Sequence, residues 1–220
     1  MGYHDYTAIL VDGGFFRRRY YSKFGEQDPK EVSKFLFEYC LGHLEEKHIQ
    51  HKLYRIFYYD CPPLEGNIFH PLTQKDINFS KTPQFKWTND FYQSLSSKRK
   101  VSIRLGKMSE NGRSYNLKSD RTKKLLKGAI TVSDLTEEDF SLSTIQKGVD
   151  MRIGLDIASL SFKKQVGQIV LISGDSDFVP AAKLARREGV DFILDPLGSG
   201  ISKDLFEHID GIKSIRSYFR

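Results

Sequence analysis

Five aspartates are the side chains of this sequence whose type and placement could do chemistry. They follow two short apolar runs and occupy a mixed segment between them: Asp12, Asp175, Asp177, Asp150 and Asp156. Carboxylate oxygens are ligands that Mg²⁺ and Mn²⁺ prefer, whereas zinc uses Cys/His sets that this sequence does not offer. A pair of such ions roughly 3.5–4 Å apart can activate water and stabilise the leaving oxygen in phosphodiester hydrolysis. The acids therefore predict a metal-dependent hydrolytic centre.

Each aspartate also has a structural explanation when it is taken alone. Asp177 could cap a helix that starts at Phe178, and Asp12 could be a turn residue before two glycines. Asp156 could pair with Arg152 on a solvated helix face. Several carboxylates at one place repel each other, and a divalent cation removes that repulsion. Their shared placement favours a joint site over separate structural roles.

The elements that must position these acids can be predicted from the apolar pattern. Short apolar runs indicate buried strands, and apolar residues spaced by three and four indicate helices. We expect strands at residues 7–11, 53–59, 101–105, 169–172 and 190–194, and helices at residues 28–44, 84–98, 148–162, 178–187 and 202–208. Residues 64–82 are predicted to be loop, Asn111-Gly112 the turn of a hairpin that includes residues 113–118, and residues 212–215 a final segment.

Strands that alternate with helices predict an α/β fold, with a central parallel sheet covered by helices on both faces. Ligands of such sheets bind beyond the carboxyl ends of the strands, where the strand order reverses. Asp12, Asp175 and Asp177 would share that edge. At about 3.6 residues per turn, Asp150 and Asp156 would point about 120° apart, so both reach one site only if Asp150 lies at the helix start.

Positive charge is concentrated in one part of the chain. Residues 81–130 contain 13 basic and 3 acidic residues, a net charge of +10, whereas the whole chain carries +6. This asymmetry is typical of a polyanion-binding surface beside an acidic centre, and a solvated basic face without a ligand is the alternative. The residues expected to bind nucleic acid are Arg17, Arg18, Lys98, Arg99, Lys100, Arg121, Lys123 and Lys124.

Aromatic residues are interleaved with the basic segment and could stack on the bases of a single strand. They are Phe85, Trp87, Phe91, Tyr92 and Tyr115, and each could instead belong to the core. We expect His43, His48 and His51 at the surface, and Cys40 and Cys61 buried or inert. No apolar run reaches the roughly 20 residues that span a bilayer and no secretory signal is evident, so we expect a cytoplasmic protein.

Three acidic segments follow one another in order, each near the end of a predicted strand or the start of a predicted helix. They are Ile9-Leu10-Val11-Asp12-Gly13-Gly14-Phe15-Phe16, then Lys147-Gly148-Val149-Asp150 with Asp156, then Ser173-Gly174-Asp175-Ser176-Asp177-Phe178, accompanied by Tyr58-Tyr59-Asp60, Leu105-Gly106 and Leu205…Asp210-Gly211-Ile212. In order and spacing they resemble the motifs of NYN domains of the PIN-like nuclease superfamily, and the bacterial LabA/DUF88 type is the most similar branch.

The resemblance covers nearly the whole chain and carries several implications. It implies one PIN-like, Rossmann-like domain over residues 1–220 with a basic insertion, residues 64–98 and 119–145 being variable or inserted. It implies a Mg²⁺- or Mn²⁺-dependent nuclease centre, usually acting on RNA. Matched by position, the catalytic and metal-binding acids would be Asp12, Asp150, Asp175 and Asp177, with Asp156 as a fifth metal ligand. Gly14 departs from the pattern, because many relatives have asparagine there.

The preferred hypothesis is a metal-dependent endoribonuclease that acts on RNA rather than DNA. A non-catalytic RNA-binding or regulatory module with a vestigial acidic site is the alternative, and the basic segment supports it equally well. A HAD-like phosphatase is the third. Its nucleophile is normally followed two residues later by a second aspartate, and that position is Gly14 here. A homodimer is compatible with each hypothesis.

Overall fold

The apolar runs form the central strands of a six-stranded parallel sheet. The computed structural model describes residues 5–46, 49–109, 111–215 and 219. The strands are β1 (Tyr6–Asp12), β4 (Lys52–Asp60), β7 (Val101–Leu105), β12 (Gln168–Ile172), β13 (Asp191–Asp195) and β14 (Gly211–Ile212). Their order across the sheet is β14-β13-β12-β1-β4-β7, and every neighbouring pair is parallel. The predicted α/β fold with a central parallel sheet is confirmed.

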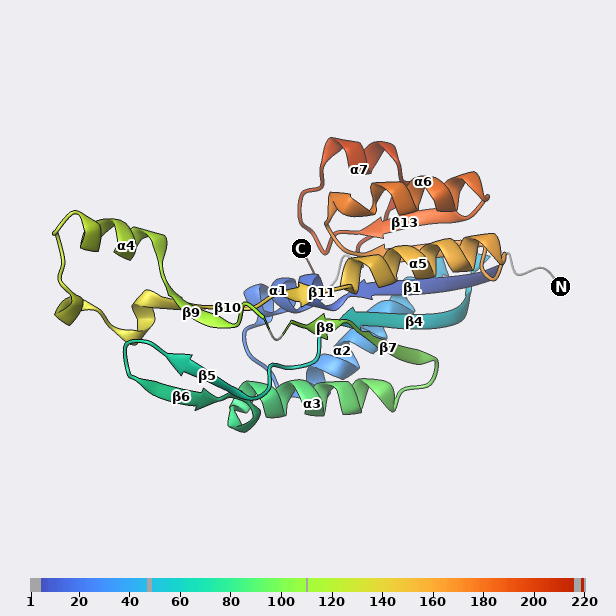
Figure 1. Ribbon diagram of the computed structural model, residues 1–220. Coiled ribbons are helices and arrows are strands. Elements are labelled where there is room, and N and C mark those ends of the chain that lie inside the picture. The colour runs from blue at the N-terminus through green and yellow to red at the C-terminus, as the bar shows by residue number, and fades with distance from the viewer. Residues whose placement is uncertain (1–4, 47–48, 110, 216–218, 220) are drawn as a thin grey trace.

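Helices cover both faces of this sheet (Figure 1). One face carries α1 (Gly13–Phe24), α2 (Pro29–Gly42) and α3 (Pro83–Ser96), and the other carries α5 (Val149–Phe162), α6 (Val179–Arg187) and α7 (Lys203–Glu207). Successive residues of a strand point to opposite faces. Ile9 and Val11 of β1 accordingly pack with α1 and α2, whereas Ala8 and Leu10 pack with α5 and α6. Burial on both faces is why β1 and β12 are apolar along their length.

The strand order reverses between β1 and β12. From β1 the chain moves outward through β4 to β7, and it then returns to the other side of β1 to form β12, β13 and β14. Val11 pairs with Ile172 at the carboxyl ends of the two strands. The connections that leave these ends diverge to opposite faces of the sheet, which opens a crevice between them. Asp12 and Ser173 are the first residues beyond that pair.

A long arm projects from the carboxyl edge of the sheet (Figure 1). It contains the hairpin of β5 (Asn67–His70) with β6 (Lys75–Asn78), the antiparallel pair of β9 (Ser114–Leu117) with β10 (Phe140–Ser143), and helix α4 (Ser119–Leu126). Its base is the short antiparallel pair of β8 (Lys107–Met108) with β11 (Gln146–Lys147). Because β8 follows β7 and β11 precedes α5, the arm is held beside the site-bearing edge at both of its ends.

Short elements complete the described part of the chain. They are β2 (Glu45–Glu46) and β3 (Ile49–Gln50), which pair with each other, and the 3₁₀ turns η2 (Phe79–Lys81), η3 (Val132–Asp134), η4 (Glu137–Asp139) and η5 (Ser176–Phe178). None of the described helices is both long and apolar enough to cross a membrane.

Three sequence-based expectations about the elements were wrong or incomplete. Residues 64–82 were expected to be loop, yet they contain the β5–β6 hairpin and η2. Residues 114–117 do form a strand, but its partner is β10 (Phe140–Ser143), rather than a strand across the Asn111-Gly112 turn. Helix α1 was not expected, because its two leading glycines and clustered aromatic and basic residues hide the helical period.

Candidate functional site

Asp12 ends β1 and begins α1, at the point where the strand order reverses. Its Oδ1 accepts a hydrogen bond from the backbone N–H of Phe15 at 3.0 Å, which makes Asp12 the N-cap of α1. Its Oδ2 accepts a hydrogen bond from Oγ of Ser173, at the end of β12, at 3.3 Å. Burial raises the pKa of Asp12 and the charge of Asp150 raises it further, while the Phe15 N–H and Arg18 act in the opposite direction.

The end of β1, the end of β4, the start of α5 and the loop after β12 surround one cavity of about 230 Å³. Its carboxylates are those of Asp12, Asp60, Asp150 and Asp175, and Arg18 is its one arginine among the described lining residues. Burial raises the pKa of Asp150, and the negative charges of Asp175 and Asp177 add to this effect. The structure therefore brings three of the predicted acids together, close enough for their charges to interact.

Asp60 was not among the acids predicted for the site. It ends β4 at the same edge as Asp12, and its side chain is 2% exposed. The carboxylate accepts hydrogen bonds from Nη2 of Arg17 at 2.9 Å, the hydroxyl of Tyr58 at 3.0 Å and the backbone N–H of Cys61 at 2.8 Å. The signal that could have found it is the one that found Asp12, an aspartate directly after an apolar strand.

Asp177 and Asp156 lie apart from the cavity that holds the other acids. The backbone N–H of Asp177 donates to Oδ1 of Asp175 at 3.0 Å, and the Asp177 residue lines a neighbouring cavity that also includes Asp150. Asp156 accepts a hydrogen bond from the Tyr59 hydroxyl at 2.7 Å. It also forms an ion pair with Arg104, with 3.2 Å between Nε and Oδ2. Six residues along α5 thus turn Asp156 toward β4 and β7.

Two glycines shape the start of α1 beside Asp12. A Cβ on Gly13 would lie 2.5 Å from the ring of Tyr58 and 2.7 Å from the carbonyl oxygen of Tyr59, so only glycine lets α1 begin this close to β4. Gly14 lines the acidic cavity, and a Cβ there would make only an ordinary contact, 3.5 Å from Oδ1 of Asp12. The structure therefore has room for a side chain at position 14.

The donor atoms of the cavity fit a hard divalent cation in kind, since they are carboxylate oxygens. Burial raises the pKa values of Asp12 and Asp150, and the charges of neighbouring aspartates raise them further. Among the residues that the structure describes, no three His, Cys, Asp or Glu side chains converge closely enough to form a coordination shell. The site thus matches the cation in donor chemistry and charge, while its side chains stand further apart than bound ligands do.

The NYN-domain profile matches residues 78–208, more than half of the chain. This chain belongs to the NYN-domain family. NYN domains form a PIN-like nuclease family, and the doubly wound sheet described above agrees with such a fold. The matched span contains Asp150 and Asp175, whereas Asp12 and Asp60 precede it. The order of the strands in the sheet brings all four aspartates to the same cavity.

One solved structure supports the fold of this NYN domain over its full length. It is the crystal structure of a protein of unknown function from Vibrio parahaemolyticus, which matches 100% of this chain and 98% of that chain with a TM-score of 0.50 and 13% sequence identity. At this identity the likeness shows a shared fold alone. No curated protein matches the chain.

The basic residues predicted to bind nucleic acid are distributed over three places in the structure. Arg17 and Arg18 lie on α1, where Arg18 lines the acidic cavity and Arg17 pairs with Asp60. Lys123 and Lys124 are exposed on α4 in the arm, while Arg121 forms an ion pair with Asp139, 2.6 Å from Nε to Oδ1. The acidic cavity and the arm therefore share one edge of the molecule.

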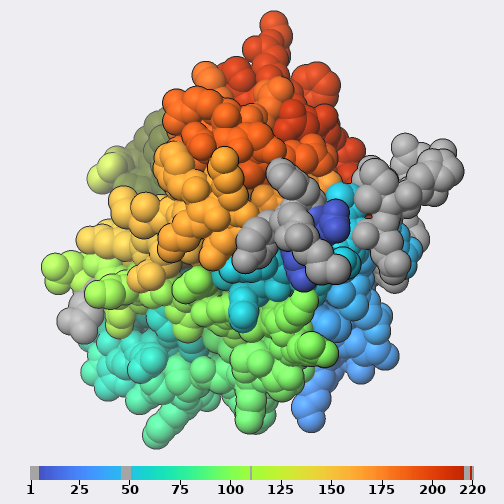
Figure 2. All heavy atoms as spheres, turned by 90° about the vertical axis from the view of Figure 1, so that its right-hand side faces the viewer, coloured from blue at the N-terminus to red at the C-terminus, as the bar shows by residue number. Residues whose placement is uncertain are grey.

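Lys98, Arg99 and Lys100 lie at the opposite edge, between the end of α3 and the start of β7. Figure 2 shows that edge, with the end of α3 and the start of β7 in green. Lys100 donates to the carbonyl oxygen of Leu53, at the amino end of β4, and Nζ of Lys98 lies 5.4 Å from the ring centre of Phe37. The sheet separates these three residues from the acidic cavity.

The interleaved aromatic residues divide between the core and other contacts. Phe91 and Tyr92 are buried beneath α3, so they belong to the core. The Trp87 ring stacks on Phe91, with ring centres 5.3 Å apart, and Tyr115 contacts the ring of His70 in the arm. Phe85 lines a cavity beside the acidic one.

The prediction that His43 lies at the surface was wrong. Its side chain is fully buried, and Nε2 lies 2.9 Å from Oδ2 of Asp195, which also accepts a hydrogen bond from the Tyr39 hydroxyl. Asp195 lies 152 residues after His43 in the sequence, so no local pattern could indicate this contact. His51 is half-buried, and His48 lies outside the described residues. Cys40 and Cys61 are buried as predicted, and burial raises the pKa of both thiols.

Proposed function

We propose that this NYN domain is a Mg²⁺- or Mn²⁺-dependent ribonuclease whose site acids are Asp12, Asp150, Asp175 and Asp177. The observation that carries the proposal is that Asp12, Asp150 and Asp175 line one cavity at the point where the strand order reverses. Burial raises the pKa values of Asp12 and Asp150, and neighbouring carboxylates raise them further, Asp150 acting on Asp12 and Asp175 on Asp150. A divalent cation relieves this electrostatic situation.

The roles of the residues follow from their positions. Asp12, Asp150 and Asp175 would hold the cation, with Asp177 beside them, and Asp156 is the least supported member because it is bound by Tyr59 and Arg104. The bound cation would supply activation of water and stabilisation of the leaving oxygen. Arg18 lines the cavity and would attract the substrate phosphate to it. Ser173 and the N–H of Phe15 fix the orientation of the Asp12 carboxylate.

RNA is the proposed substrate class, and the arm is the proposed contact surface outside the cavity. The segment of residues 81–130 carries a net charge of +10, and exposed Lys123 and Lys124 on α4 lie in the arm at the edge that bears the site. Lysines on such a surface bind phosphates without reading sequence. Within the NYN-domain family, we propose that this protein is of the LabA/DUF88 type.

A non-catalytic RNA-binding module is the second candidate. The observation in its favour is that no three acidic, histidine or cysteine side chains in the described part of the chain stand at coordination distance. Gly14 argues against a HAD-like phosphatase, because it occupies the position of the second aspartate that such an enzyme needs.

The test is cleavage of labelled single-stranded RNA and DNA in the presence of Mn²⁺, Mg²⁺ or EDTA. The proposal expects cleavage of RNA that requires the metal and that Asp175→Asn abolishes. Asp5→Asn is the matched control, because Asp5 is exposed and lies before β1, at the opposite edge of the sheet. Salt-sensitive RNA binding without any cleavage by the wild type would instead support the binding module.

A further inference from the structure

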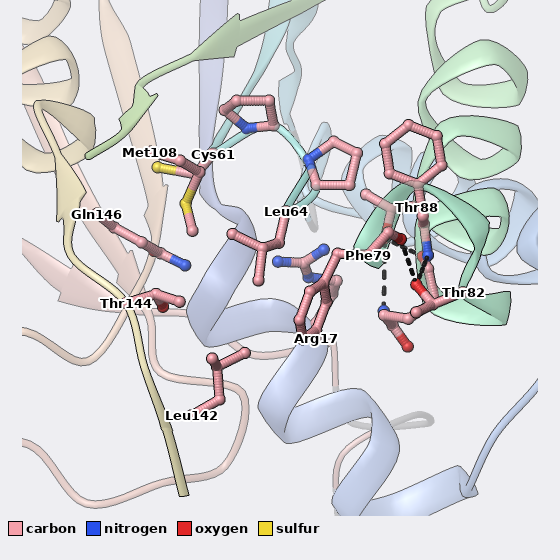
Figure 3. Close-up of a pocket in the computed structure, with 14 residues that line it drawn as sticks. Arg17, Cys61, Leu64, Phe79, Thr82, Thr88, Met108, Leu142, Thr144 and Gln146 are labelled. Atoms are coloured by element: carbon pink, nitrogen blue, oxygen red, sulfur yellow. Dashed lines mark hydrogen bonds between the residues drawn. The ribbon is translucent and has the colours of Figure 1, made fainter. Parts of the chain in front are cut away.

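A second cavity, of about 300 Å³, lies beside the acidic cavity (Figure 3). Most of its wall is apolar and much of it is formed by flat side chains. The residues that matter for the argument are Pro62, Phe79, Phe85, Leu142, Arg17 and Gln146. Figure 3 shows Phe79 and Thr82 on one side, Leu142, Thr144 and Gln146 on the other, and Arg17 reaching in from α1 between them.

The two cavities share a wall. Gln146 lines both of them, and Arg17, which lines the second cavity, is paired at 2.9 Å with Asp60, which lines the acidic one. A ligand with a charged group in the acidic cavity and an apolar ring attached to it could therefore occupy both at once. The second cavity closes only because the arm's strands β10 and β11 supply one of its sides.

Two polar groups of this cavity are available to a ligand. Within the described part of the chain, the side-chain amide of Gln146 has no hydrogen-bond partner, so its donors and its acceptor are free. Arg17 uses only Nη2 in its ion pair with Asp60 among the described residues. Thr82, Gln84 and Thr88 also line the cavity, but they form hydrogen bonds with each other or with the backbone at the start of α3. A mostly apolar slot with a free amide and a guanidinium is the environment in which proteins hold unpaired nucleobases, by stacking and by hydrogen bonds to the base edge.

We propose that this second cavity, the base pocket, receives one unpaired nucleobase of the nucleic-acid strand whose phosphodiester lies in the acidic cavity. The inference rests on the proposed nuclease function for the position of that phosphate. A base inside a duplex cannot enter the pocket without being flipped out of the stack. The base pocket therefore makes single-stranded RNA the substrate that is cleaved, and a perfect RNA duplex a poor one.

The first experiment measures cleavage of short single-stranded RNAs in which each nucleotide in turn is replaced by an abasic one. For the wild type, one abasic position next to the cut slows cleavage about 5- to 150-fold, the range expected for loss of one stacked base. Leu142→Trp fills the base pocket and slows cleavage of intact RNA by a similar factor. In this variant the abasic position has no further effect, because both changes remove the same contact.

Two further variants keep this measurement decisive. Thr144→Trp fills the pocket from a different residue, in case Leu142→Trp does not fold. Phe206→Trp is the matched control, because Phe206 is 59% exposed on α7 and lines neither cavity. It keeps both the wild-type rate and the wild-type sensitivity to the abasic position. Equal sensitivity to every abasic substitution in the wild type and in both pocket variants would overturn the inference.

The second experiment separates the base pocket from catalysis. Asp150→Asn is mixed in EDTA with single-stranded RNAs that carry the fluorescent base 2-aminopurine at one position at a time. The pocket predicts a change of fluorescence at one position, which Leu142→Trp and Thr144→Trp remove. If the wild type never cleaves RNA but this change occurs, the nuclease proposal fails and the pocket stands. If the wild type cleaves RNA and no position responds, the pocket fails and the nuclease stands.

Discussion

Arg17 and Asp60 form an ion pair at the wall between the acidic cavity and the base pocket, with 2.9 Å between Nη2 and Oδ1. The side chains are 19% and 2% exposed, so water contributes little to stabilising either charge and each charge faces the other. The pair links the start of α1 to the end of β4, and with them the two cavities.

Removing one partner of this pair should destabilise the fold. Asp60→Asn leaves the guanidinium of Arg17 without its carboxylate, and we expect the free energy of unfolding to fall by about 3 kcal/mol. The double variant Arg17→Met/Asp60→Asn should recover part of this loss, because it leaves no unpaired buried cation. Urea unfolding followed by circular dichroism measures both values. A double variant less stable than Asp60→Asn alone would contradict this account.

A divalent cation should stabilise the folded protein through the acidic cavity. A cation that binds only the folded state adds about 2.7 kcal/mol at 100 times its Kd, so Mn²⁺ should raise Tm in a concentration-dependent way. Asp175→Asn should abolish most of this rise, because Asp175 lines the cavity. Asp156→Asn should keep it, because Asp156 is bound by Tyr59 and Arg104 outside the cavity. Thermal melts with and without Mn²⁺ measure this rise in Tm for the wild type and both variants. Loss of the rise in Asp156→Asn would mean that Asp156 is a metal ligand after all.

Without metal, Asp150→Asn should make the protein slightly more stable at neutral pH. The pKa of Asp150 is raised above 3.8 in the folded state by burial and by Asp175 and Asp177, so the folded state binds more protons than the unfolded state. This group's contribution to stability therefore falls as pH rises through its folded pKa. Because Asp150 is exposed to solvent, we expect a gain of only about 0.5 kcal/mol at pH 7.

The control for this prediction is the pH dependence of the difference in Tm between Asp150→Asn and the wild type. Below about pH 3 the Asp150 carboxyl is mostly protonated in both the folded and the unfolded state, so the difference in Tm between Asp150→Asn and the wild type should shrink toward zero. Melts in EDTA from about pH 3 to about pH 8 provide the comparison. A stability difference that grows toward low pH would have the wrong sign for like-charge repulsion at the site.

The two groups of basic residues should differ in their effect on RNA binding. Lys123→Ala/Lys124→Ala should weaken binding to every RNA sequence and lower the salt dependence of log K by about 1 for each lost phosphate contact. Lys98→Ala/Arg99→Ala should leave both nearly unchanged, since these residues lie at the opposite edge of the sheet. Filter binding at several salt concentrations gives the slopes. Equal losses in the two variants would mean that RNA also follows the opposite edge.

The sequence predicts the sheet and most of its helices because their apolar pattern is local. Residues 7–11 and 169–172 are short, nearly continuous apolar runs. Such runs are typical of strands that helices cover on both faces. Helix α1 was not predicted, because its start depends on the N-cap that Asp12 provides and on the space that Gly13 leaves beside Tyr58. Such a start is set by tertiary contact rather than by periodicity.

The candidate site is predictable to the extent that its acids follow strands. Asp12 is the last residue of β1 and Asp175 lies in the loop after β12, and the geometry of parallel sheets places them together. Asp60 obeys the same rule, yet its pairing with Arg17 comes from a residue 43 positions away. The helical spacing allowed Asp150 and Asp156 to share one site if Asp150 lay at the helix start. Asp150 does lie there, yet Asp156 accepts a hydrogen bond from Tyr59 that no local pattern reveals.

The position of β12 beside β1 has a consequence for the order in which this chain folds. One edge of β1 pairs with β4 within the first 60 residues, but the other waits for residues 168–172. Contacts of such long sequence separation form late, and until then β1 presents an open edge on which other chains could pair. During synthesis, Asp12 therefore exists long before Asp175 emerges. An incomplete chain on the ribosome has no acidic cavity, so any activity of the site begins only once Asp175 has joined Asp12 and Asp150.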